Sequence, residues 1–255
     1  MIRKLIGFVF LTLAAVTLRA SEGTLSVSPA VVMLQGSTGQ STTQTLTLMN
    51  GTSQPLSFDM VARDVVVRDC RRTLVNAGQL AGSVANTAVF SPKNVTVAPG
   101  EKRTVEVTVT IPPNPAARGI VAMFEGTTKL QSRGMQVTAS LGTLLTFALS
   151  DNAMADASPL VVTPPTAASN MSVAQQLSNG GSEPVLAQGM LAIVNQTGTL
   201  VAKQAMTPRR LLPGEKIGMS AQYGGELAAG RYRALVTYVL QNNKTLTSSA
   251  EFDVK

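Results

Sequence analysis

The chain has 255 residues, a hydrophobic fraction of 44% and a formal net charge of +7 at neutral pH. It contains no His and one Cys, which excludes Ser-His-Asp and Cys-His nucleophiles, His-ligated metals, and thiolate zinc or iron–sulfur sites. No phosphate loop of the G-x-x-x-x-G-K-[ST] kind occurs. We therefore expect a non-enzymatic protein without cofactor or metal. A carboxylate-based hydrolase is the distant alternative.

The first twenty residues have the order of a secretory signal peptide. "MIRK" supplies two positive charges, residues 5–18 are apolar or small, and Arg19-Ala20 leads into the polar "SEGT". The run is short for a bilayer span, which takes about 20 apolar residues. We predict a signal peptide at 1–20, and a mature chain outside the cytoplasm that does not insert into a membrane.

The positive charge of the mature chain is mild. Without Arg3, Lys4 and Arg19, eighteen basic residues stand against fourteen acidic ones. The densest basic cluster, "ARDVVVRDCRR" at 62–72, contains two Asp, and the chain has no Trp. A nucleic-acid surface needs a more coherent basic stripe with aromatic stacking. We expect no nucleic-acid partner and a solvated hairpin at 62–72.

Cys70 has no partner for an intrachain disulfide, because it is the single Cys of the chain. Its neighbours Asp69 and Arg71 indicate an exposed turn. Nothing else in the sequence supports redox chemistry. We interpret Cys70 as incidental, with pairing to another molecule as the alternative.

Short alternating runs separated by Pro and Gly predict an all-β chain. "TTQTLTLM" at 42–49 alternates Thr or Gln with Leu, and "RTVEVTVTI" at 103–111 alternates Val or Ile with charged and hydroxyl residues. Such a period of two buries one face of a strand and exposes the other. Recurring turn signals between the runs favour a sandwich, and no long amphipathic helix is evident.

Three sequence features occur twice in the same order. They are "NGTSQP" at 50–55 and "NGGSEP" at 179–184, "PGEK" at 99–102 and 213–216, and "ARGIVAMF" at 117–124 and "AGRYRALV" at 229–236. Asn-Gly and Pro-Gly are generic turn formers, so the shared order carries the inference of duplication.

The duplicated order predicts two tandem immunoglobulin-like β-sandwich domains. We place the N-terminal domain at 21–150, a polar linker at 151–158, and the C-terminal domain at 159–255.

The most unusual segment is "MQVTASLGTLLTFAL" at 135–149. Its apolar residues share one parity, and the other parity is mostly small or polar. As a single strand it is long beside the typical 5–6 residues and extends roughly 50 Å. We predict that part of it lies at an exposed edge and can add to a partner's sheet. The alternative is a last core strand bent at Gly142.

The chain resembles the periplasmic pilus-assembly (PapD-like) chaperones, whose fold is a pair of immunoglobulin-like domains. The residues that carry the resemblance are the signal peptide, "TLSVSPAVVML" at 24–34, "NGTSQPLSF" at 50–58, "FSPKNVTVAPGEKRTVEVTV" at 90–109, and 135–149. In that family the corresponding strand donates apolar side chains to an incomplete pilin domain. The resemblance assigns this role to Met135, Val137, Ala139, Leu141 and Leu145.

The chain also departs from that family, and so resembles a divergent member. The family holds a partner's C-terminal carboxylate with an Arg in the first strand and a Lys in the donating strand. Neither 24–34 nor 135–149 contains Arg or Lys. Lys129 and Arg133 stand just before the strand and are the candidate carboxylate anchors.

The resemblance implies a non-enzymatic periplasmic chaperone that binds and escorts a β-rich, pilin-type subunit by strand addition. An outer-membrane usher is a further expected partner. The alternative is a secreted or cell-surface immunoglobulin-like protein with a structural or adhesive role. Exposed apolar residues within 135–145 favour the chaperone, and their complete burial favours the alternative.

Overall fold

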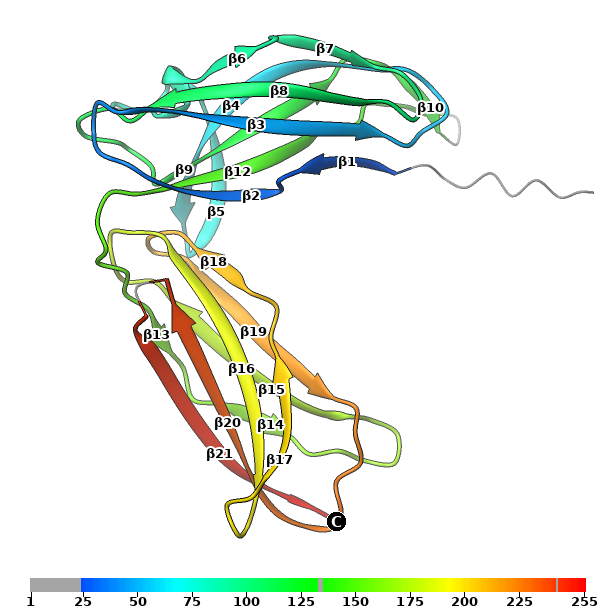
Figure 1. Cartoon of the computed structure of the whole chain (residues 1–255), viewed down its shortest axis with the longest axis vertical. Helices are drawn as coiled ribbons and strands as arrows, with labels where there is room; N and C mark the ends of the chain where they lie inside the picture. Colours follow the sequence, from blue (N-terminus) through cyan, green and yellow to red (C-terminus); the bar gives the residue numbers. More distant parts are fainter. Residues whose placement is uncertain (1–23, 133–134, 242) are drawn as a thin grey trace, which may run out of the picture.

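The computed structural model describes residues 24–132, 135–241 and 243–255, so the predicted signal peptide lies outside the described residues. The chain forms two β-sandwiches that meet at an angle, with the N-terminal one uppermost in Figure 1. This architecture confirms the predicted fold class of two tandem immunoglobulin-like sandwiches. No helix in the described part of the chain has the length and apolar character needed to cross a membrane.

The N-terminal sandwich consists of two sheets and a separate hairpin. One sheet has the strand order β1-β3-β8-β6, the other has β2-β12-β9-β4-β5 with β7 also paired to β4, and β10 pairs with β11. The elements are β1 (Leu25–Ser28), β2 (Val31–Gln35), β3 (Ser41–Asn50), β4 (Leu56–Arg68), β5 (Arg71–Asn76), the 3₁₀ helix η1 (Ala85–Thr87), β6 (Val89–Ser91), β7 (Asn94–Val97), β8 (Lys102–Thr110), β9 (Gly119–Gly126), β10 (Leu130–Ser132), β11 (Met135–Val137) and β12 (Leu141–Ala148).

The C-terminal sandwich also has two sheets. In one, β15 pairs with β13, β14 and β19, and the other has the order β17-β16-β20-β21 with β18 also paired to β16. The strands are β13 (Asp156–Ala157), β14 (Val161–Thr163), β15 (Met171–Ser178), β16 (Val185–Asn195), β17 (Leu200–Ala205), β18 (Arg209–Leu211), β19 (Lys216–Tyr223), β20 (Gly230–Leu240) and β21 (Thr245–Val254).

The segment predicted as a linker, 151–158, packs partly with the C-terminal sandwich. Ala153 and Ala155 are buried in its core, and β13 pairs with β15. We propose that the C-terminal unit begins before residue 153, earlier than the sequence analysis placed it.

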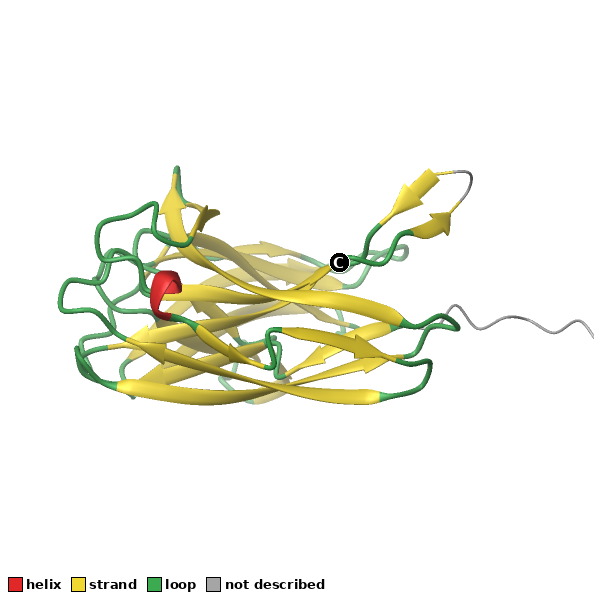
Figure 2. Ribbon diagram, turned by 90° about the horizontal axis from the view of Figure 1, so that it is seen from above, coloured by secondary structure: helices red, strands yellow, loops and turns green. Residues whose placement is uncertain are grey.

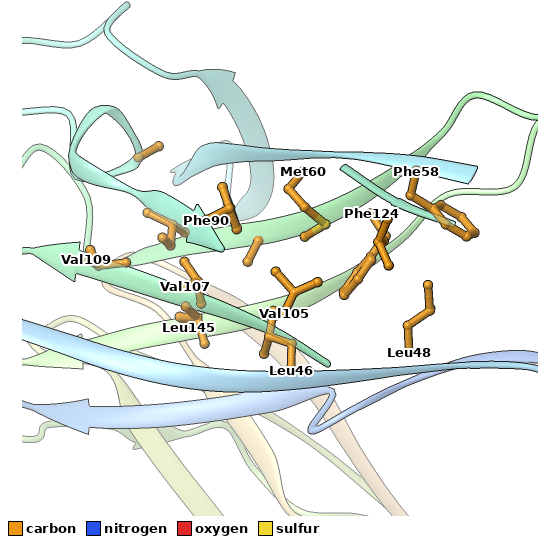
Figure 3. Packing of buried hydrophobic residues seen from close by; sticks show 14 of the residues in the cluster. Leu46, Leu48, Phe58, Met60, Phe90, Val105, Val107, Val109, Phe124 and Leu145 are labelled. Carbon is orange, nitrogen blue, oxygen red and sulfur yellow. The ribbon is translucent and has the colours of Figure 1, made fainter. Parts of the chain in front are cut away.

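Strands with a period of two build the core of the N-terminal sandwich, as predicted. Leu46 and Leu48 of β3 face Phe58 of β4 and Phe124 of β9 across the sandwich (Figure 3), and all four are at most 1% exposed. Each such buried side chain contributes roughly 1.5–3 kcal/mol. The alternate residues of β3 face outward, where Thr43 hydrogen-bonds Thr108 of β8 at 2.8 Å. Alternation therefore sets which face of each sheet is dry.

The predicted hairpin at 62–72 is present. Strand β4 turns at Asp69 and Cys70, which both have positive φ (50° and 62°), and returns as β5. Its tip is not fully solvated, because it contacts the C-terminal sandwich through the backbone of Cys70 and the side chain of Arg72.

The repeated Asn-Gly and Pro-Gly motifs contact each other in both sandwiches. Buried Asn50 donates through Nδ2 to the carbonyls of Gln54 and Val97, at 2.8 and 2.9 Å. Asn179 donates in the same way to the carbonyls of Glu183 and Leu211, at 2.8 and 3.2 Å. Each Asn therefore joins its own Asn-Gly turn to the chain that precedes the Pro-Gly turn.

The Pro-Gly turns repeat the same contacts. The N–H of Gly100 donates to the carbonyl of Asn50 at 2.7 Å, and the N–H of Gly214 donates to that of Asn179 at 2.8 Å. Both glycines have positive φ (73° and 78°), which favours Gly at these positions. The matching hydrogen bonds support the predicted duplication independently of the sequence.

The second copy of this corner forms the joint between the sandwiches. Glu215 lies 2.8 Å from Arg72 Nε, and Glu183 lies 3.6 Å from Arg118 Nε and accepts the N–H of Leu149 at 3.0 Å. At the same joint, Leu212 packs against the N-terminal sandwich in an apolar cluster with Val65, Leu144, Val67 and Val121. Charged and apolar contacts together fix the joint.

We predict that Asn50→Ala and Asn179→Ala each lower the free energy of unfolding by about 2–4 kcal/mol, because each removes two hydrogen bonds that a buried amide donates. Urea denaturation followed by circular dichroism measures the change. Exposed Asn94, which bonds Asp59, is the matched control, and Asn94→Ala should cost less than about 0.5 kcal/mol. Equal small losses in all three variants would contradict the structural role of the buried Asn.

Glu101 and Glu215 form a second matched pair, since each accepts the N–H of the residue three positions earlier at 2.9 and 2.8 Å. Glu215 is buried and paired with Arg72, whereas Glu101 pairs with the exposed Arg103. We predict that Glu215→Gln costs about 1–3 kcal/mol and Glu101→Gln less than about 1 kcal/mol. The same urea measurement compares them, and a cost for Glu101→Gln equal to that for Glu215→Gln would refute a stabilising ion pair at the joint.

Candidate functional site

Segment 135–149 is two strands, and the prediction of one continuous strand is wrong. β11 pairs with β10, β12 pairs with β9 and β2, and residues 138–140 belong to neither strand. The reason is a close crossing of the backbone. A Cβ on Gly126 would lie 2.0 Å from the carbonyl oxygen of Ala139, and the N–H of Gly126 donates to Ser140 Oγ at 3.1 Å. The break precedes Gly142, where the sequence suggested a bend.

The β10–β11 hairpin stands away from both sandwiches (Figure 2). Its two strands form a sheet of their own, so the outer edge of each carries backbone N–H and C=O groups that no described strand pairs. Open strand edges of this kind are templates for pairing with another chain. Met135 and Val137, two of the predicted partner-binding residues, lie on β11.

The remaining predicted residues are progressively more buried along the chain. Ala139 and Leu141 are half-buried, and Leu141 packs against the edge of the N-terminal core. Leu145 is 0% exposed inside that core (Figure 3). Leu145 is therefore a core residue and not a partner-binding one. At this point one side of β12 faces the sandwich core, and Leu144 on the other side packs in the apolar cluster of the joint.

The edge of β12 that faces away from β9 is open only at its start. Pairing with β9 runs from Leu141, but pairing with β2 begins at Leu144. Thr143 is already tied there, since its Oγ1 donates to the carbonyl of Pro29 at 2.7 Å. The accessible edge is therefore the hairpin and the residues that join it to β12.

Of the two candidate carboxylate anchors, the structure describes Lys129 alone. Lys129 is exposed in the connection between β9 and β10, beside the hairpin. Arg133 lies outside the described residues. Among the residues that the structure describes, no group of three or more Cys, Asp or Glu side chains is arranged to hold a metal.

Cationic side chains gather instead in a cleft of about 580 Å³ at the joint, here called the joint cleft. The tip of the β4–β5 hairpin lines one wall, and β18 with the start of β19 lines the other. The lining residues are Val31, Cys70, Arg71, Arg72, Leu144, Thr207, Pro208, Arg209, Arg210, Glu215, Lys216 and Ile217. Burial, together with the charge of Arg72, lowers the pKa of Arg210.

Sequence reasoning missed the joint cleft. Two Arg-Arg pairs, at 71–72 and 209–210, were the available signal, but they lie 138 positions apart. Only the fold shows that Arg72 Nη2 donates to the carbonyl of Arg210 at 2.6 Å.

A family model described as "Fn3-like domain" matches residues 32–141, within the N-terminal sandwich. No curated protein matches the chain.

The solved structures that resemble the chain include several fimbrial chaperones. The class 5 fimbriae chaperone CfaA is 12% identical with a TM-score of 0.45, and the match covers 89% of this chain and 98% of that one. The E. coli chaperone DraB is 13% identical with a TM-score of 0.41, covering 91% and 98%. A chain from the complex of the Salmonella enterica SafA pilin with the SafB chaperone is 9% identical with a TM-score of 0.41, covering 91% and 97%.

Proposed function

We propose that this chain is a non-enzymatic periplasmic chaperone that binds and escorts a β-rich, pilin-type subunit. The binding element is the open edge of the β10–β11 hairpin and the residues leading into β12. Met135, Val137, Ala139 and Leu141 supply the apolar side chains. Lys129 and Arg133 remain proposed carboxylate anchors, and an outer-membrane usher remains a proposed further partner.

One observation carries this proposal: an alternating apolar run continues from the core strand β12 into a hairpin that stands outside both sandwiches. Within a closed sandwich, apolar alternation is explained by the core. Here Leu145 lies in the core and Leu141 packs against it, but β11 pairs with no described strand other than β10. Unpaired edges combined with alternating apolar residues are what strand addition requires, since backbone pairing gives affinity and side-chain pockets give specificity.

The magnitudes favour an extended contact over a few apolar anchors. Burial of Met, Val or Leu contributes roughly 1.5–3 kcal/mol each, so Met135, Val137 and Leu141 together supply at most about 9 kcal/mol. Association costs an estimated 4–15 kcal/mol. Because these figures nearly cancel, pairing along the backbone edge must provide much of the net affinity. A partner with an incomplete sheet supplies the complementary edge.

We predict that Val137→Lys abolishes recovery of the β-rich partner when the tagged chain is purified from the periplasm and bound proteins are identified by mass spectrometry. Gln136→Lys adds the same charge at the neighbouring position of opposite parity and should retain the partner. Circular dichroism should show both variants folded, because β11 belongs to neither sandwich sheet.

Recovery of the same partner with Val137→Lys as with the unchanged chain would refute strand donation. Recovery of no β-rich partner even with the unchanged chain would favour the alternative of a structural or adhesive module. Leu141 is a poorer test position, since it also contacts the core.

A further inference from the structure

The last strand of the C-terminal sandwich has a long open edge. β21 has ten residues and stands at the end of the sheet order β17-β16-β20-β21, where it pairs with β20 alone among the described strands. β13 and β14 belong to the other sheet and pair with β15. In Figure 1, β21 runs along the left side of the C-terminal sandwich, and the N-terminal sandwich lies beyond its upper end. The side of this domain therefore presents a strand edge that no described strand covers.

β21 also lacks the features that usually keep an edge strand from pairing. Proteins guard such edges with short strands, Pro, β-bulges or Lys side chains. The opposite edge of the same sheet has an irregular ladder at Ile193/Val194, carries Lys203, and is divided into β17 and β18 by a segment that contains Pro208. The ladder of β21 with β20 is continuous over Thr245–Val254, and this range contains no Pro, Gly, Lys or Arg. We therefore expect another strand to cover β21.

The odd-numbered residues of β21 direct their backbone groups toward the open edge. At the turn that joins β20 to β21, the N–H of Leu240 donates to the carbonyl of Lys244 at 2.9 Å. In an antiparallel ladder, hydrogen-bonded residue pairs alternate with pairs whose N–H and C=O groups point outward. Val239 and Thr245 are the next pair along the ladder, so Thr245 and every second residue after it present these groups to the edge. The residues concerned are exposed and are Thr245, Thr247, Ser249, Glu251 and Asp253.

We propose that β21 pairs with β21 of a second copy of this chain, antiparallel and about a two-fold axis, so that one sheet continues across two C-terminal sandwiches. A strand edge is complementary to its own copy in this arrangement, because each outward N–H meets an outward C=O. With Ser248 on the axis, Thr247 lies opposite Ser249 of the second copy. Hydroxyl pairs of this kind stabilise antiparallel strands, and one already joins β20 to β21, where the hydroxyls of Thr237 and Thr247 lie 3.3 Å apart. The contact does not depend on strand addition at the hairpin.

The charges of β21 are compatible with a second copy. Glu251 is neutralised within its own chain by Arg231 and Arg233 of β20, at 2.6 and 2.8 Å. In the proposed register Glu251 lies opposite Thr245 of the second copy, and the two Glu251 residues stand about 20 Å apart along the strands. Like charges therefore do not face each other across the axis. The antiparallel copy also places its own N-terminal sandwich at the opposite end of the joined sheet, away from the first one (Figure 1).

Sedimentation velocity of the full mature chain over a range of concentrations tests the dimer. The unchanged chain should shift reversibly from monomer to dimer as the concentration rises. Thr247→Pro removes an N–H that points to the open edge and spares the ladder with β20, so this variant should fold and dimerise about ten- to hundredfold more weakly. Ser249→Lys places like charges on either side of the axis and should have the same effect. Gln188→Lys adds the same charge on β16, on the same face but two strands from the edge, and should leave the dimer unchanged.

Amide exchange measured by NMR at low and high concentration locates the contact. Dimer formation should slow exchange at Thr247 and Ser249, whose N–H groups point to the edge, and change little at Ser248, whose N–H points to β20. Val137→Lys on the hairpin should dimerise as the unchanged chain does, so the outcome for β21 and the outcome for strand donation are separable.

A chain that stays monomeric at every concentration would overturn the inference, as would a dimer that Thr247→Pro leaves as strong as before. Circular dichroism shows whether each variant folds. If Thr247→Pro does not fold, Ser249→Lys decides alone, and its unchanged dimerisation would place the contact elsewhere. Loss of the dimer in Val137→Lys would assign the contact to the hairpin and overturn pairing at β21.

Discussion

The buried Asn side chain at the corner of each sandwich is the interaction on which the rest of the structure depends. In both copies the Asn stands where a strand ends, and its buried amide donates to two carbonyls, one in its own Asn-Gly turn and one just before the Pro-Gly turn. The Asn amide suits this corner because it carries two donors on a short side chain. This closure brings the Asn-Gly turn and the Pro-Gly turn together at one end of the sandwich.

The joint between the sandwiches follows from the second of these corners. Gln54 in the first copy is Glu183 in the second, and the added charge contacts Arg118 and the backbone of Leu149. Glu215 caps its Pro-Gly turn as Glu101 does in the first copy, and it also pairs with Arg72 of the other sandwich. In the N-terminal sandwich this corner closes one end of the domain. In the C-terminal sandwich the same corner also forms the contact between the two domains. The same arrangement places Arg71 and Arg72 of the β4–β5 hairpin beside Arg209 and Arg210, which gives the joint cleft its basic lining.

Much of the fold could be predicted from local patterns, because alternation and turn chemistry depend on neighbouring residues. The strands at 42–49 and 103–111 and the repeated order of turns all follow from such signals. The break at 138–140 does not, because it depends on Gly126 lying beneath Ala139, and a contact between distant segments leaves no trace in the spacing of either. The same limit applies to Leu145, whose burial depends on where the break falls.

The close passage of Ala139 over Gly126 has a mechanical consequence. The crossing interrupts the strand between the hairpin and the sheet. A continuous strand would have passed any movement of the hairpin on to β12 and the core. Among the described residues, neither strand of the hairpin pairs with a strand of either sandwich, so the hairpin can change its direction without breaking a sandwich ladder. Gly126 itself stays in the ladder of β9 with β4, so a change in the direction of the hairpin is taken up by the two segments that join it to the sandwich, 127–129 and 138–140.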